Sequence, residues 1–257
     1  MIVDTHAHLT DKHLAPEIEH FLGLAADAGV TRVLSIATTL EDSRTNVQLA
    51  EKHECLRASV GIHPNNCCQA APEDWSAIKE LASHPQVVAL GETGLDRYWD
   101  DCPWDTQVDY FRRHLELSAE TNLPVVIHTR DCAQETLALL QEVAQQLPLS
   151  GVMHSFTGPP EVAAACVELG LYVSFAGMLT FKNGKEVRES AKVVPLDRLL
   201  VETDSPYLTP HPHRGKRPNH PALVVHTLHQ LAQLFNLPDE EMARHTTDNT
   251  NRLFGNW

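Results

Sequence analysis

The sequence lacks several features that would place it in another class of protein. No apolar run approaches the roughly 20 residues needed to cross a bilayer, so no membrane partner is expected. No basic stretch followed by an apolar one opens the chain, and we therefore expect a cytoplasmic location. No linker, repeat or break in composition divides the 257 residues, of which 42% are hydrophobic and 21% charged. We expect one domain over residues 1–257.

The sequence also lacks a cysteine pattern typical of disulfides, and its acidic residues outnumber its basic ones. The 6 cysteines show no C-x-x-C spacing, so we expect free thiols rather than a disulfide framework. The formal net charge of -14 argues against a broad nucleic-acid footprint. It does not exclude a nucleic-acid substrate, because bound divalent cations would reverse the charge locally. The 16 histidines raise the question of how many converge.

Short segments rich in Val, Ile and Leu alternate with helical patterns along the chain. Such segments predict parallel strands covered by helices. We expect strands at Ile2–Asp4, Arg32–Ala37, Ala58–Ile62, Val87–Gly91, Pro124–His128, Gly151–His154, Leu171–Phe175 and Leu199–Thr203. Strands alternating with helices over this length predict an α/β fold, a (β/α)8 TIM barrel. A doubly wound open sheet is the alternative, but it gives no reason for ligand-type residues at so many strand ends.

Apolar residues at three- and four-residue steps predict the helices. These lie at Pro16–Ala28, Pro72–Ser83, Trp104–Thr121, around Leu137, Leu140, Ala144 and Leu147, at Ala222–Phe235, and at about Asp239–Thr246. We expect Asn249 and Arg252 to fix the C-terminal helix.

The predicted strand ends carry residues that bind metals. His6 and His8 are two apart in an extended segment, so their imidazoles point to the same face. In a barrel the carboxyl ends of all strands meet on one face, where active sites lie. The residues found at the later strand ends are His63, Glu92, His128, His154 and Asp204. Imidazoles and carboxylates that converge in this number suit two metals about 3.5–4 Å apart.

Each residue also has a structural alternative. His128 or His154 alone could be a hydrogen-bonded core histidine. Glu92 could be a turn carboxylate, and Asp204 could cap the turn before Pro206. Their joint occurrence at strand ends favours a shared metal site.

Motifs that span the chain from end to end point to one family. They are VDTHAHL, GIHP, VVALGETGLD, PVVIHTRD, GVMHSFTG, LLVETDSPYL, HPHRGKRPN and TTDNTNRLF. Together they resemble the TatD family of metal-dependent hydrolases, within the amidohydrolase-like barrels. The resemblance implies a two-metal phosphodiesterase, typically a deoxyribonuclease. It implies the following ligands: His6, His8, Glu92 and Asp204 for one ion, and Glu92, His128 and His154 for the other, with Glu92 bridging.

The catalytic candidates are Asp204, Glu92 and His63. A water between the ions would be activated at neutral pH. Asp204 would orient it and take its proton, and His63 would hydrogen-bond the phosphate or the leaving oxygen. The mixed imidazole and carboxylate ligands fit Zn, Mn or Ni better than Mg, which the family commonly uses, so the identity of the two divalent ions stays open.

The loop Thr209–His220 holds Arg214, Lys216 and Arg217 and no acidic residue. Loops after the last barrel strands often bind phosphate, and an Arg fork suits its oxygens. We expect Arg214 to contact substrate phosphate, and the other two to be solvated. Nearby aromatic residues could stack bases, although core or lid packing is the alternative: Tyr98, Trp99, Phe156, Phe181 and Tyr207.

With the resemblance, these features lead us to expect a phosphodiesterase or deoxyribonuclease, of the 3′–5′ exonuclease type on single-stranded DNA, and we expect a monomer. The alternatives are another hydrolase with the same site, such as an amidohydrolase, a lactonase or a D-aminoacyl-tRNA deacylase, and a non-catalytic metal-binding module. A bridging Glu92 argues against amidohydrolases that use a carbamylated lysine. Asp204 and the basic loop argue against a non-catalytic module.

Overall fold

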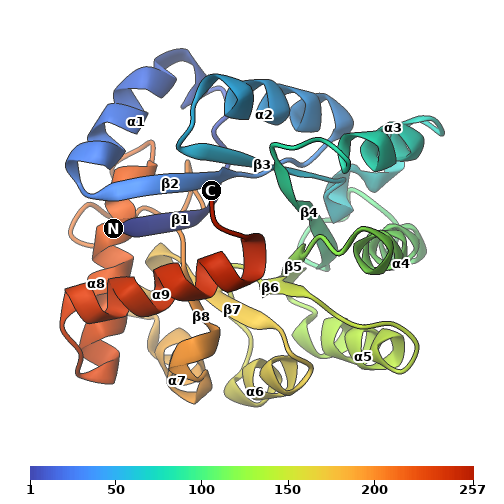
Figure 1. Cartoon of the computed structure of the whole chain (residues 1–257). Helices are drawn as coiled ribbons and strands as arrows, with labels where there is room; N and C mark the ends of the chain where they lie inside the picture. Colours follow the sequence, from blue (N-terminus) through green and yellow to red (C-terminus); the bar gives the residue numbers. More distant parts are fainter.

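The computed structural model describes residues 1–257 and contains eight parallel strands in the order β1-β2-β3-β4-β5-β6-β7-β8 (Figure 1). The strands are β1 (Ile2–Ala7), β2 (Val30–Ser35), β3 (Leu56–Val60), β4 (Val87–Asp96), β5 (Val125–Arg130), β6 (Gly151–Met153), β7 (Tyr172–Phe175) and β8 (Leu199–Val201). The last strand returns to the first, because Thr5 Oγ1 donates to the Val201 carbonyl at 3.0 Å and Ala7 forms a parallel bridge with Ser205. The predicted (β/α)8 barrel is confirmed.

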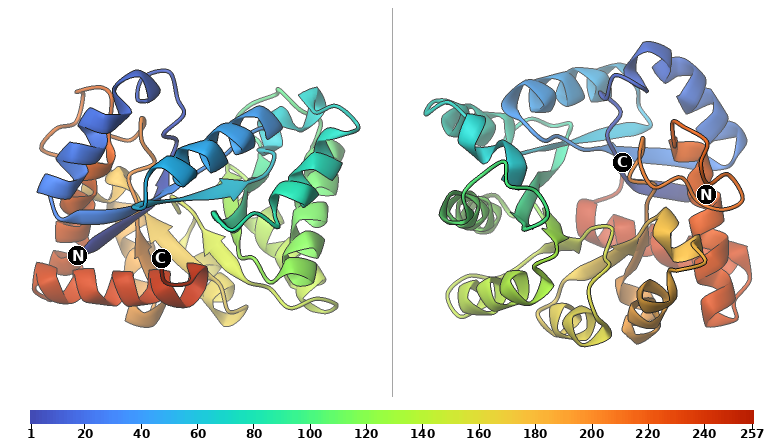
Figure 2. Two further views of the ribbon diagram at one scale, coloured as in Figure 1. Left: turned by 45° about the horizontal axis from the view of Figure 1, so that its top comes forward. Right: turned by 180° about the vertical axis from the view of Figure 1, so that it is seen from behind.

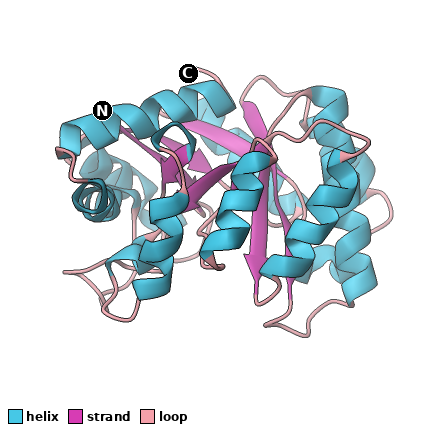
Figure 3. Cartoon of the chain, turned by 90° about the horizontal axis from the view of Figure 1, so that it is seen from below, coloured by secondary structure: helices cyan, strands magenta, loops and turns pink.

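Helices surround the strands on the outside, as the views in Figures 2 and 3 show. They are α1 (Ile18–Asp27), α2 (Leu40–Lys52), α3 (Asp74–Leu81), α4 (Trp104–Thr121), α5 (Ala133–Ala144), α6 (Pro160–Glu168), α7 (Lys185–Val193), α8 (Val224–Phe235) and α9 (Asp239–Phe254). None of them combines the length and apolar character needed to cross a membrane. All six cysteines are free.

The barrel has two apolar cores. The larger one, of 52 buried residues, includes apolar residues of the strands and of the surrounding helices. The smaller one, which we call the inner core, includes residues in or next to β2, residues of β4 to β8, and one residue of α9. These are Leu34, Ile36, Ala89, Val126, Val152, Tyr172, Leu200 and Phe254. Helix α9 crosses the strands in Figure 1. This helix therefore packs against the inner core, away from the carboxyl ends that remain free for a site.

Helix α9 is longer than the sequence predicted. The sequence predicted an end near Thr246, and the Thr, Asn and Asp residues that follow have low intrinsic helix preference. Tertiary contacts reverse that preference. Asn249 is buried, and its Nδ2 donates to the carbonyls of Leu196 and Leu199, each at 2.8 Å. Arg252 donates to Asn249 Oδ1 at 2.6 Å, so the expectation that these two residues fix the helix is confirmed.

Several other predicted boundaries differ from the observed ones. β4 continues to Asp96, beyond the predicted end at Gly91, because Thr93 to Asp96 pair with β5. β6 and β8 stop at Met153 and Val201, one and two residues before their predicted ends, because the parallel pairing with β7 ends there.

Candidate metal centre

The alternation of strand side chains connects the inner core to a polar site at the carboxyl ends. Val126 of β5 lies in the inner core, and His128 follows two residues later on the same face. Val152 precedes His154 by the same step, and the His154 N–H donates to the Ile127 carbonyl at 3.0 Å, which keeps it beside β5. In β1, His6 is fully buried and His8 follows just beyond the strand.

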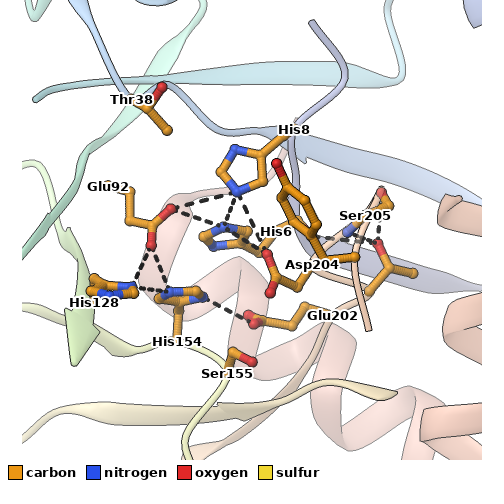
Figure 4. A network of polar contacts seen from close by, with 12 residues as sticks. His6, His8, Thr38, Glu92, His128, His154, Ser155, Glu202, Asp204 and Ser205 are labelled. Atoms are coloured by element: carbon orange, nitrogen blue, oxygen red, sulfur yellow. Dashed lines mark hydrogen bonds and ion pairs between the residues drawn. The ribbon is translucent and has the colours of Figure 1, made fainter. Parts of the chain in front are cut away.

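One group of donor atoms surrounds a common point (Figure 4). His6 Nε2 lies 3.2 Å from His8 Nε2, and the two nitrogens lie 3.4 and 3.6 Å from Glu92 Oε2. They lie 3.7 and 3.5 Å from Asp204 Oδ1. Around an ion with ligand bonds of about 2.1 Å, the corners of a tetrahedron are about 3.4 Å apart. The observed spacings fit four ligands of one divalent ion.

The other oxygen of Glu92 faces a second group. Glu92 Oε1 lies 2.8 Å from both His128 Nδ1 and His154 Nε2, which are 3.3 Å apart. The remaining nitrogens of these rings face two carboxylates, Asp96 Oδ2 at 2.9 Å and Glu202 Oε1 at 3.2 Å. A carboxylate in this position fixes the tautomer of a histidine so that its inner nitrogen is free to bind a metal.

From the sequence we predicted no role for Asp96 or Glu202, although both belong to the strand-end motifs. Glu202 follows Leu200 of the inner core by two residues, so the alternation already places it inward. Asp96 ends β4 and is 2% exposed. A carboxylate within a strand-end motif was the available signal in both cases.

His63 lies just beyond the end of β3, and its surroundings set its protonation. Its Nε2 lies 3.6 Å from Glu92 Oε1, and its donor atoms, with those of Glu92 and His128, lie within 4.8 Å of one another. The Nδ1 atom accepts a hydrogen bond from the Asn65 backbone N–H at 3.1 Å. Burial lowers the pKa of His63 to about 3. The ring is therefore neutral and, because Nδ1 accepts from Asn65, its proton lies on Nε2, which faces Glu92 as a hydrogen-bond donor.

The charges within the site are strongly coupled. Burial would raise the pKa of Glu92, but the imidazoles of His154 and His63 and hydrogen bonds from His128 and His154 hold it well below its ordinary value. Burial would lower the pKa of His8, yet its hydrogen bond to Asp204 and the charge of Glu92 raise it to about 9. Protons on imidazoles thus balance the carboxylates of the ion-free protein, and binding of cations would displace them.

Asp204 has a backbone conformation that is unusual for a non-glycine residue. Its φ of 54° lies in the left-handed region, a conformation that costs on the order of 1–3 kcal/mol and clusters at functional sites. Its N–H donates to the His6 carbonyl at 2.9 Å, and its carbonyl accepts from Tyr207 at the same distance. These bonds hold the carboxylate beside His6 and His8. Burial would raise its pKa, but the hydrogen bond from His8 lowers it.

A cleft of about 1200 Å³ opens above these groups. Arg214, Lys216 and Arg217 all line it, so the basic loop faces the metal centre. The Arg214 guanidinium lies 3.6 Å from the centroid of the Phe181 ring, which also lines the cleft. Phe156 lies in the loop after β6, as expected, and its side chain is fully buried in the larger core, so the core-packing alternative is confirmed for this residue. That burial removes it from any role in base stacking.

Comparison with known proteins identifies the family of this chain. A sequence model of the TatD-related DNase family matches residues 3–255. The metal-dependent hydrolase YabD of Bacillus subtilis (strain 168) is 41% identical over 254 residues, covering 99% of both chains. The 3′-5′ ssDNA/RNA exonuclease TatD of Shigella flexneri serotype 5b is 34% identical over 256 residues, covering 98% of both chains. The crystal structure of YJJV, a TatD homologue from Escherichia coli K12, superimposes with a TM-score of 0.94 at 29% identity, covering 100% of this chain and 98% of that one. This chain belongs to the TatD family of metal-dependent hydrolases.

Proposed function

We propose that the chain is a phosphodiesterase that removes nucleotides from the 3′ end of single-stranded DNA. The observation that carries this proposal is the division of the Glu92 carboxylate between two donor groups, with one oxygen facing each. We assign the first ion to His6, His8, Glu92 and Asp204, and the second to Glu92, His128 and His154. A carboxylate shared by two cations is the arrangement that suits in-line displacement at phosphorus.

The protein residues have separate tasks in this scheme. Bound divalent ions would polarise the phosphoryl oxygens and make a water acidic enough to lose its proton near neutral pH. Asp204 is ionised at neutral pH because its pKa is low, so its carboxylate would be free to accept that proton. His63 donates from Nε2 to a phosphoryl or leaving oxygen, and Arg214 binds a substrate phosphate from the basic loop.

Three features support a nucleic-acid substrate over the other hydrolases. The cleft is lined by Arg130, Arg214, Lys216 and Arg217, although the chain as a whole is acidic. The bridging position is taken by a glutamate, so no carbamylated lysine is needed. The Shigella relative carries the name of a single-strand exonuclease. We further propose a monomer, since every candidate ligand comes from one chain, and ions such as Zn, Mn or Ni, since imidazoles form most of the ligand set.

The first experiment is metal analysis of the protein purified without added ions, followed by assays on bis(p-nitrophenyl) phosphate and defined-end oligonucleotides. We expect hydrolysis of both, loss of both with EDTA and recovery on adding Mn or Mg. Phosphorothioate linkages at the 3′ end should block degradation, whereas the same linkages at the 5′ end should not. Hydrolysis of a lactone, an amide or D-aminoacyl-tRNA without any phosphodiester cleavage would refute the proposal in favour of another hydrolase.

A further inference from the structure

A cluster of aromatic rings and one arginine lies at the edge of the cleft, outside the metal centre. Tyr98 and Trp99 belong to the loop between β4 and α4, and Arg130 ends β5. The two rings pack edge to face with centroids 4.8 Å apart. The Arg130 guanidinium lies 3.6 Å from the Tyr98 centroid and 5.8 Å from that of Trp99. We name these three residues the aromatic platform.

The platform is exposed, but it is held in place. Tyr98 and Trp99 are 52% and 49% exposed, and Trp99 and Arg130 line the cleft. Asp96 Oδ1 accepts hydrogen bonds from the backbone N–H groups of both aromatic residues, at 2.8 and 3.0 Å. The buried Gln107 side chain donates to the carbonyls of Asp96 and Cys102, which closes the loop at both ends. A ligand that binds there therefore meets a loop whose backbone is already held in place, which lowers the entropic cost of binding.

The platform is also connected to the metal centre. The carboxylate that fixes its backbone is the one whose Oδ2 faces the His128 ring. A group stacked on Trp99 is thus positioned relative to the second donor group.

The charge of Arg130 is available to a ligand. It forms no ion pair, whereas the neighbouring Arg97 pairs with Glu135 at 3.2 Å. Asp100 and Asp101 follow in the same loop, but neither lines the cleft. A flat apolar surface next to an unpaired guanidinium matches a base joined to its phosphate, because every base has a π-face and every linkage an anionic oxygen.

We propose that Tyr98, Trp99 and Arg130 form a binding site for one unpaired base of a single-stranded nucleic acid and its adjoining phosphate. This inference names the substrate contact of the proposed function and rests on it for the nature of the ligand. The site would favour a single strand over a duplex, because each base face in a duplex is covered by the neighbouring base pair.

The direct test is the affinity of a fluorescein-labelled phosphorothioate decathymidylate, which resists hydrolysis, measured by fluorescence anisotropy. Trp99→Ala should weaken binding about five-fold or more, and Trp99→Phe, which keeps a ring, should restore most of it. Arg130→Gln should reduce the slope of log affinity against log salt by about 0.7, as expected for one lost phosphate contact on a single strand. A ribo-oligonucleotide should respond similarly, and a blunt duplex should not respond to Trp99→Ala.

Arg113→Gln is the matched control, because Arg113 also lies over a tyrosine ring, 5.0 Å from the Tyr110 centroid, but does not line the cleft. Unchanged affinity in Trp99→Ala, with the variant folded, would overturn the platform. Arg113→Gln should also keep hydrolysis of bis(p-nitrophenyl) phosphate within two-fold of wild type. If the oligonucleotide binds through Trp99 while no phosphodiester is cleaved, the proposed function fails and the platform stands.

Discussion

Asp96 Oδ2 lies 2.9 Å from His128 Nε2, at the junction between the metal centre and the aromatic platform. Burial would raise the pKa of Asp96, but the hydrogen bond with His128 lowers it to about 2. The carboxylate is therefore ionised and accepts the Nε2 proton, which directs Nδ1 toward Glu92. One buried acid thus sets the tautomer of a candidate ligand.

Asp96→Asn should lower the affinity for the second ion by about 10- to 100-fold. With its oxygen on the Tyr98 and Trp99 N–H groups, the new amide would present a donor to His128 Nε2. The ring would then carry its proton on Nδ1, where the ion binds. Isothermal titration of the metal-free protein with Mn measures this, and Asp131→Asn is the control because Asp131 is exposed in the same cleft. An unchanged affinity in folded Asp96→Asn would contradict the assigned tautomer.

Glu92→Gln and Asp204→Asn should separate metal binding from catalysis. Glu92→Gln removes the shared carboxylate, and we expect it to lose both ions and all activity. Asp204→Asn keeps His128, His154 and Glu92, so we expect it to retain one ion while kcat on bis(p-nitrophenyl) phosphate falls by about 10²–10⁴ through loss of the first ion and of the proton acceptor. Metal content by mass spectrometry should be determined on the same samples as the rate. Wild-type turnover by Asp204→Asn would show that another group accepts the proton.

Removal of the ions should destabilise the fold. A ligand present at 100 times its Kd stabilises the folded state by about 2.7 kcal/mol. For a chain of this size, that loss corresponds to a Tm lower by roughly 5–10 °C. Calorimetry with EDTA and with added Mn measures this difference in Tm. Glu92→Gln, which we expect to bind no ions, should have the same Tm under both conditions. Equal Tm values for wild type under the two conditions would mean that the folded protein does not bind Mn.

The buried His114 leads us to expect that the folded protein loses stability in mild acid. The ring is fully buried; its Nε2 accepts from the Ile62 N–H at 3.2 Å, and its Nδ1 donates to the Tyr110 carbonyl at 2.7 Å. Burial lowers its pKa from 6.5 to about 4. The unfolded chain therefore binds a proton more readily, so the contribution is fully present above pH 6.5 and is lost as the pH falls toward 4. The loss is on the order of 3 kcal/mol.

Urea unfolding in EDTA between pH 7 and 4 tests this contribution. His114→Gln should flatten the decline in the free energy of unfolding, because the titrating ring is gone. The exposed His13 provides the control, and His13→Gln should follow the wild-type curve. The buried ring would have no such role if both variants showed the same slope.

Alternation along the chain was enough to predict the barrel and the convergence of the candidate ligands. His128 and His154 each follow an inward-facing valine by two residues, and this period is a local property of extended backbone. The TatD motifs carry the same residues, so the resemblance and the periodicity agree. The roles of the ligands and of Asp204 remain predictions for the experiments above.

Only the tertiary structure decided which partners these residues meet. The proton on His63 depends on Asn65, and the orientation of His154 depends on Glu202. The extended end of α9 reversed the local helix preference because its residues found a buried environment. The physical reason is that periodicity fixes which face of its own strand a side chain occupies, whereas its hydrogen-bond partners come from segments that only barrel closure and loop packing bring alongside.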